Sequence, residues 1–307
     1  MMTAGRFCVQ LKIPVTHNFD FWRTVYSHGW CALPPFSSNK SDKSLSRVLS
    51  LWSGEPVACK LCSKRKTIEV TIEGGSQLTK MQSDKVTQDL RTCLRLDENF
   101  EEFYRVARRY PRYRWISRVR AGRLLRSPTM FEDAVKMICT TNCTWALTTL
   151  MVTNLVETLG KKSVAGAKSF PEAQDIAATS VQFLRREIKA GYRAPYLLEM
   201  AERVASGDLD IEGWRTSQMT TADLHKEMRN VKGIGPYAAA NLLKLSGRYD
   251  YLGLDSWVRG KYYELHTKGR LVKDSTIEKR YHEYGSWRGL FFWLEMTRHF
   301  HEDKFTF

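Results

Sequence analysis

The sequence predicts an α+β protein in which a small β-rich part precedes a larger, mainly helical part. Two stretches near the start alternate apolar and polar side chains, as half-buried strands do: Phe7–Ile13 and Thr67–Ile72. Beyond about residue 100 the apolar spacing becomes helical. A chain of 307 residues can bury a sizeable core and suggests two domains. We therefore expect a sheet-plus-helix domain at 1–120 and a helical core at 121–307.

Helices also interrupt the β-rich part. They are predicted at Phe19–Tyr26, along a stretch that runs through Val86 and Leu94, and at Phe100–Arg109. The segment Pro34–Ser41 contains two prolines and four serine or asparagine residues, which predicts a loop.

Nine arginines between Arg105 and Arg126 alternate with aromatic residues such as Tyr110 and Trp115. This pattern suits phosphate contact and base stacking. A solvated basic face with a few buried rings explains it equally well, and we favour that interpretation for most of the positions.

Two helices are predicted in the middle of the chain. One passes through Phe131 and Ile138 and ends in the polar stretch Cys139–Trp145; the next spans Trp145–Leu159 and stops at Gly160.

A second pair of helices encloses a glycine hairpin, over about 222–247. Thr220-x-x-Asp223 is the pattern of a capping box before a helix at Ala222–Asn230. Pro236 suits the first position of the following helix, and Gly247 is a plausible stop.

Gly233 and Gly235 bracket Ile234 and allow the backbone to turn tightly and approach another molecule closely. The N–H groups here and the positive end of the second helix would together hold a phosphate. Asp255 follows Gly235 by twenty residues, in an otherwise apolar stretch. It is either a carboxylate for chemistry on a nucleotide or a helix N-cap before Trp257, and the two roles are compatible.

The run Gly233-Ile234-Gly235-Pro236-Tyr237, followed by Asp255, resembles the helix-hairpin-helix DNA glycosylases, also called the HhH-GPD superfamily. The resemblance covers roughly Gly122–Met296. The N-terminal part resembles, more weakly, the antiparallel sheet-plus-helix domain of alkyladenine and 8-oxoguanine glycosylases. Some relatives carry an iron–sulfur cluster on four C-terminal cysteines, but no cysteine follows Cys143, which excludes that branch.

The resemblance implies a mechanism. Asp255 matches the carboxylate that stabilises an oxocarbenium-like sugar while the base departs. Relatives that also cut the backbone have a lysine where this chain has Tyr237, and Lys232 and Lys244 lie off that position. We therefore expect base release without lyase activity. No metal or organic cofactor is required, although the hairpin carbonyls could hold a structural cation.

The resemblance also implies site residues. Asn142 falls where relatives insert a wedge into the gap left by the flipped nucleotide, though an ordinary helix cap is an equal alternative. The segment Gly191–Tyr196 resembles one that packs below the active site. The expected DNA-binding residues are Asn142, Lys232, Gly233, Ile234, Gly235, Tyr237 and Arg259. The expected base-pocket residues are Trp145, Tyr237, Trp257, Phe292 and Met296, although an aromatic stripe at helical spacing is more often core.

The composition agrees with a nucleic-acid partner. The formal charge is +15 at pH 7, which favours a polyanion. The expected partner is double-stranded DNA that contains a modified base, bound by a monomer. An alkylated purine is the first expectation; an oxidised purine and a bulky modified cytosine of phage DNA are alternatives. A non-catalytic DNA-binding protein is the alternative of another class.

The cysteines and hydropathy bear on the compartment. Seven cysteines without a preceding signal peptide favour a reducing interior, and Cys59-x-x-Cys62 has no partner at zinc spacing. No apolar run reaches transmembrane length. We expect a cytoplasmic, nucleoid-associated protein in a bacterium or a nuclear one in a eukaryote.

Overall fold

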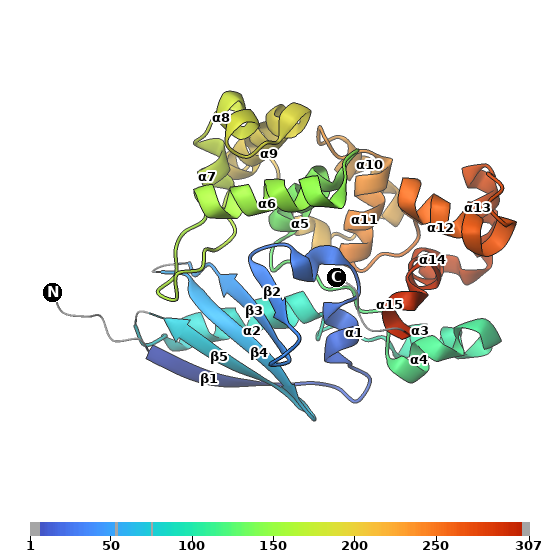
Figure 1. Ribbon diagram of the computed structural model, residues 1–307, viewed down its shortest axis with the longest axis horizontal. Coiled ribbons are helices and arrows are strands. Elements are labelled where there is room, and N and C mark those ends of the chain that lie inside the picture. The colour runs from blue at the N-terminus through green and yellow to red at the C-terminus, as the bar shows by residue number, and fades with distance from the viewer. Residues whose placement is uncertain (1–6, 53–54, 75, 303–307) are drawn as a thin grey trace.

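The computed structural model describes residues 7–52, 55–74 and 76–302, in which a sheet lies beside a larger group of helices (Figure 1). The sheet is antiparallel throughout, in the order β1-β5-β4-β3-β2. Its strands are β1 (Phe7–Pro14), β2 (Phe36–Asn39), β3 (Ser44–Leu49), β4 (Val57–Lys64) and β5 (Thr67–Gly74). The predicted α+β class and both predicted strands are confirmed.

The prediction of a loop at Pro34–Ser41 is wrong for its central part, which forms β2. Phe36 is buried and lies opposite Arg47 of β3, whose guanidinium is 4.3 Å from the centre of the Phe36 ring. Ser37 and Asn39 are exposed. A strand at the edge of a sheet can carry such polar residues, and so its composition does not distinguish it from a loop.

The helices of the first half are α1 (Phe21–Val25), α2 (Lys80–Leu94), α3 (Glu101–Arg109), α4 (Arg114–Val119), α5 (Met130–Thr140) and α6 (Trp145–Leu159). Those of the second half are α7 (Ala173–Ala177), α8 (Val181–Arg186), α9 (Ala194–Ser206), α10 (Thr221–Arg229), α11 (Pro236–Ser246), α12 (Ser256–Thr267), α13 (Asp274–Tyr281), α14 (Arg288–Met296) and α15 (Arg298–Glu302). No helix among the described residues is both long enough and apolar enough to cross a membrane.

Helix α3 packs against residues near the C-terminal helix α14. Phe103 lies 5.1 Å from Trp287 and 5.2 Å from Phe291, measured between ring centres. Residues 101–119, which fall within the predicted unit 1–120, therefore pack against the C-terminal helices. One continuous hydrophobic core joins the sheet, α2 and the helical part.

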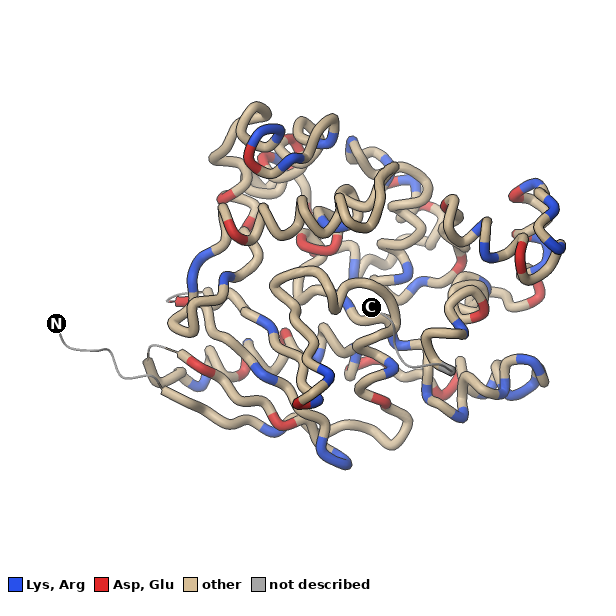
Figure 2. The backbone as a smooth tube through the Cα atoms, viewed as in Figure 1, with Lys and Arg blue, Asp and Glu red and all other residues tan. Residues whose placement is uncertain are grey.

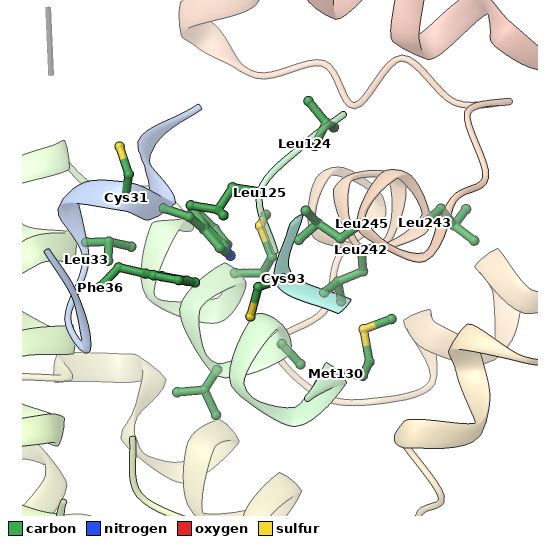
Figure 3. Packing of buried hydrophobic residues seen from close by; sticks show 14 of the residues in the cluster. Cys31, Leu33, Phe36, Cys93, Leu124, Leu125, Met130, Leu242, Leu243 and Leu245 are labelled. Atoms are coloured by element: carbon green, nitrogen blue, oxygen red, sulfur yellow. The ribbon is translucent and has the colours of Figure 1, made fainter. Parts of the chain in front are cut away.

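Helix α11 lies at the centre of this core. Figure 3 shows Leu242 and Leu245 on the side of α11 that faces Cys93 of α2, with Leu243 on the opposite side. All three leucines are at least 96% buried. The helix that follows the hairpin is therefore fixed by contacts on both sides.

Buried arginines hold the far end of α11. Arg95 Nη1 donates to the carbonyl of Lys244 at 2.8 Å, and Arg126 Nη1 donates to the carbonyl of Leu245 at 2.9 Å. These carbonyls belong to the last turn, where a helix lacks internal donors and carries partial negative charge. Arg126, together with the buried Arg123, is therefore structural. The remaining members of the arginine run are exposed beside buried rings, as in the basic-face interpretation.

The other charges are spread over the surface. Figure 2 shows lysines and arginines on every part of the fold, with acidic residues among them. The densest excess is at Arg105–Arg120, which contains seven arginines and no acidic residue. Elsewhere the two signs are mixed, and so the net charge alone does not mark a binding face.

Candidate active site beside the helix-hairpin-helix

The hairpin between α10 and α11 has the predicted geometry. Thr220 Oγ1 accepts the N–H of Asp223 at 3.1 Å and so caps α10. Gly233 has φ = +89°, a conformation that favours glycine, and Gly247 ends α11 with φ = +96°. The expected helix, hairpin and helix are confirmed within one residue at each boundary.

Within the hairpin, Ile234 differs from its predicted role. Its side chain is 2% exposed and its N–H donates to the carbonyl of Val231 at 3.0 Å. Ile234 therefore anchors the hairpin in the core and has no surface to offer DNA. Gly235 is exposed, and so is Lys232, whose Nζ pairs with Glu199 at 2.8 Å.

Asp255 caps α12 and also faces a cavity. Its Oδ1 accepts the N–H of Val258 at 2.8 Å, so Asp255 is the N-cap of α12 through one of its two carboxylate oxygens. The residue is half-buried and lines the cavity described below. The cap fixes the orientation of the carboxylate, which supports a chemical role as well as a structural one.

Tyr237, in the first turn of α11, reaches the same carboxylate. Its hydroxyl interacts with Asp255 and with Thr140. Burial raises the pKa of Tyr237 well above its usual value, and the nearby negative Asp255 raises it further. The phenol therefore keeps its proton and can position Asp255, but it cannot act as an amine nucleophile.

The cavity beside Asp255 measures about 510 Å³. Tyr237, Trp145 and Trp257 all line it, as do Thr140 and Met137 of α5. Trp145 and Trp257 are 43% and 46% exposed, so both stand at its open side. Its volume falls in the range of roughly 300–1,000 Å³ typical of drug-sized ligands, which are larger than a single purine.

The N-terminal part of the chain supplies a wall of this cavity that the sequence did not predict. His28, Gly29 and Trp30 line it. A side chain on Gly29 would meet the Trp145 ring at 2.3 Å, so only glycine lets Trp145 lie against this segment. His28 Nε2 donates to the carbonyl of Leu125 at 2.6 Å, and burial lowers the pKa of His28 to about 4. A neutral imidazole therefore faces the cavity.

The predicted pocket residues Phe292 and Met296 do not line the cavity. Both are fully buried in the core. Their shared helix face turns inward, and the neighbouring Trp293 of α14 lines the cavity instead. This corrects the prediction for the C-terminal block.

Lys244 also lies in the cavity wall, although it was not among the predicted site residues. Tyr237, Asn241 and Lys244 are spaced i, i+4 and i+7 along α11 and therefore share one face. Lys244 Nζ donates to the carbonyl of Leu252 at 2.5 Å and to Asn241 Oδ1 at 3.1 Å. Burial lowers the pKa of Lys244 to about 7, against an opposing effect of the negative Asp255.

Asn142 lies at the exposed turn between α5 and α6, with φ = +46°. It is not the cap of either helix: Thr141 ends α5, and Thr144 Oγ1 accepts the N–H of Leu147 at 3.3 Å. Arg193 is buried under the turn and donates to the carbonyl of Thr141. The turn is therefore held firmly while the Asn142 side chain points out beside Tyr192, its partner at 3.4 Å.

We expect Asn142→Ala to slow base release from a paired target about tenfold more than from the same base opposite an abasic gap. A wedge offsets part of a flipping cost of a few kcal/mol, and a gap has already removed some of that cost. The measurement is the ratio of single-turnover rates on the two duplexes. The control is Thr144→Ala, which removes a cap worth roughly 0.5–2 kcal/mol and should affect both duplexes alike. An unchanged ratio in Asn142→Ala would contradict the wedge.

Arg259 is held by an acidic partner within the protein. Arg259 forms a two-point ion pair with Asp274, with both N–O distances at 2.8 Å, and its contact with DNA stays a prediction. Among the described residues, no group of three or more histidine, cysteine, aspartate or glutamate side chains is arranged to hold a metal ion.

The fold matches known structures, although neither a protein-family model nor a curated protein matches the sequence. A 3-methyladenine DNA glycosylase from Archaeoglobus fulgidus has a TM-score of 0.75 at 20% identity, covering 95% of this chain and 99% of that chain. The 8-oxoguanine glycosylase/lyase of Clostridium acetobutylicum, in its apo form, has a TM-score of 0.73 at 17% identity, covering 94% and 95%. The same enzyme with double-stranded DNA has a TM-score of 0.68 at 18% identity, covering 92% and 93%. The chain therefore shares the fold of these DNA glycosylases.

Proposed function

We propose that the protein is a monofunctional DNA glycosylase, which flips a modified base out of double-stranded DNA and hydrolyses its N-glycosidic bond to leave an abasic site. The observation that carries this proposal is the position of Asp255, at the wall of a large cavity and next to the hairpin. The shared fold supports it.

Each part of the proposed reaction has residues to perform it. The exposed Gly235 and the positive end of α11 hold a phosphate of the DNA backbone. The flipped base enters the cavity between Trp145 and Trp257. Asp255 then stabilises the positive charge that develops on the sugar while a water molecule adds to it. Tyr237 holds the carboxylate in place.

The experiment that tests the proposal is an assay for abasic sites on duplexes that contain an alkylated purine, an oxidised purine or a bulky modified cytosine. Release from at least one of them, with strand breakage only after alkali, is the expected result. Tight binding to DNA without release from any duplex would instead favour the non-catalytic DNA-binding protein. The cavity volume of about 510 Å³ accommodates all three base classes, so all three belong in the panel.

We expect no covalent protein–DNA adduct when the reaction is treated with borohydride. A Schiff base requires an amine that reaches the sugar, and Tyr237 offers none. Lys244 lies seven residues farther along α11, about 10 Å down the helix axis, beyond the place of the missing lysine. The measurement is gel separation of trapped adducts, with Tyr237→Lys as the variant that restores an amine there. An adduct formed by the unmodified protein and lost in Lys244→Met would overturn the monofunctional assignment.

A further inference from the structure

Lys244 is the one ammonium group among the residues that line the cavity, and the reaction proposed above does not use it. Its side chain is 2% exposed, at the inner end of the face of α11 that also carries Tyr237 and Asn241. Lys244 lies about two helical turns from Tyr237 along α11, while its Nζ lies within electrostatic reach of Asp255. An ammonium in this position can meet a base that enters the cavity.

The surrounding residues hold this ammonium in a fixed position. Two of its three hydrogens are donated, to the carbonyl of Leu252 at 2.5 Å and to Asn241 Oδ1 at 3.1 Å. Asn241 is itself held, because its Nδ2 donates to the carbonyl of Tyr237 at 3.0 Å. Gly253 has φ = +67°, and a side chain there would come within 2.6 Å of Nζ. The absence of a side chain at Gly253 therefore leaves the space that the ammonium group occupies.

We propose that Lys244 is a specificity-determining residue that donates its third N–H to a carbonyl oxygen of a neutral flipped base and disfavours a cationic, N-alkylated base. This inference rests on the proposed function and refines its substrate class. It shifts the expectation from an alkylated purine toward a neutral base with a hydrogen-bond acceptor.

The chemistry favours a neutral base for two reasons. A buried ammonium is unfavourable unless it is paired, and a carbonyl oxygen pairs it whereas a second cation repels it. When a neutral base leaves, the electrons of the glycosidic bond pass to the base, and a hydrogen bond from Nζ stabilises the negative charge that develops. Nothing is transferred to the lysine; water adds to the sugar as in the proposed hydrolysis.

The charge of Lys244 depends on pH and on the groups that face it from other elements. Asp255 lies close enough to favour the ammonium, while the neutral His28 and the protonated Tyr237 add no charge. His299 also lines the cavity. Burial lowers the pKa of Lys244 to about 7, so the ammonium dominates below that pH and its repulsion of a cation fades above it.

The test compares two duplexes that differ in one charge. One contains 7-methylguanine, a cation, and the other contains 7-methyl-7-deazaguanine, which is neutral, has the same shape and keeps the same carbonyl. Both carry a 2′-fluoro sugar that prevents hydrolysis, and affinities are measured by fluorescence anisotropy. We expect Lys244→Met to lower the preference for the neutral duplex by about tenfold or more, since a unit charge at contact distance commonly changes affinity by that factor.

Taking the ratio removes the intrinsic difference in flipping between the two bases. Lys64→Met, at an exposed position on β4, is the matched control and should leave the ratio unchanged. Lys244→Gln is the second variant: it removes the charge but keeps a hydrogen-bond donor for the carbonyl of Leu252, so it should lower the preference as Lys244→Met does even if Lys244→Met folds poorly.

The two proposals fail in different ways. A ratio that neither Lys244→Met nor Lys244→Gln changes would overturn the role of Lys244 while leaving base release intact. Absence of base release from the whole panel of duplexes would overturn the glycosylase itself, whatever the ratio.

Discussion

Asp255→Asn should slow base release by at least about 10²–10³-fold while leaving duplex affinity within about twofold. Asparagine keeps the shape and still accepts the N–H of Val258, and the two residues are equally good helix caps. What the substitution removes is the negative charge that stabilises the oxocarbenium-like sugar. Single-turnover release and anisotropy binding measure the two quantities separately.

The comparison variant is Asp97→Asn, which removes a surface carboxylate paired with Arg91. A partly exposed pair of this kind contributes little to stability, so this variant should match the unmodified protein in release and binding. If Asp255→Asn releases the base at a near-normal rate, the cap at α12 is the whole role of Asp255 and the proposed chemistry is wrong.

Local signals explain why the hairpin could be predicted. Pro236 and Gly247 each act within one turn of the chain, and α11 spans Pro236–Ser246 as expected. The strands β2, β3 and β4 escaped prediction because they carry polar residues whose partners lie elsewhere in the chain, such as Arg47 with Glu132 of α5 and Lys60 with Asp42. Pairing of that kind depends on residues distant in the sequence.

Only part of the site could be predicted, because some of its residues come from distant parts of the chain. His28 and Gly29 lie more than two hundred residues from Asp255, and no local pattern connects them with the cavity. Phe292 was assigned to the right helix but to the wrong face, since the spacing of apolar residues does not say which face meets a cavity. Lys244 was within reach of prediction, because the helical period places it on the face of Tyr237.

The two hairpin glycines should differ in how strongly alanine substitution changes the stability of the fold. Gly233 has φ = +89°, and a side chain there would lie 2.9 Å from Cβ of Tyr196. Gly233→Ala should therefore destabilise the fold by roughly 1–3 kcal/mol, the usual cost of a strained backbone conformation. At Gly235, φ is −80° and no atom lies within 4 Å of the position of a new side chain. Gly235 is the N-cap of α11, where alanine is less favourable than glycine, and this cost offsets the entropy gain of adding a side chain. Gly235→Ala should therefore leave stability within about 1 kcal/mol of that of the unmodified protein.

The affinity for DNA should separate these variants further. The open space at Gly235 is where a backbone phosphate would approach the N–H groups at the start of α11, so Gly235→Ala should weaken duplex binding by about tenfold or more with little change in stability. Gly269→Ala is the matched control for Gly233→Ala, because φ there is +83° with nothing within 4 Å, so it carries the same kind of backbone strain away from the hairpin. Urea unfolding and anisotropy binding at one salt concentration provide the two readouts. Normal duplex affinity in Gly235→Ala would mean that the phosphate is held elsewhere, because a methyl group at that position would otherwise occupy the space the phosphate needs.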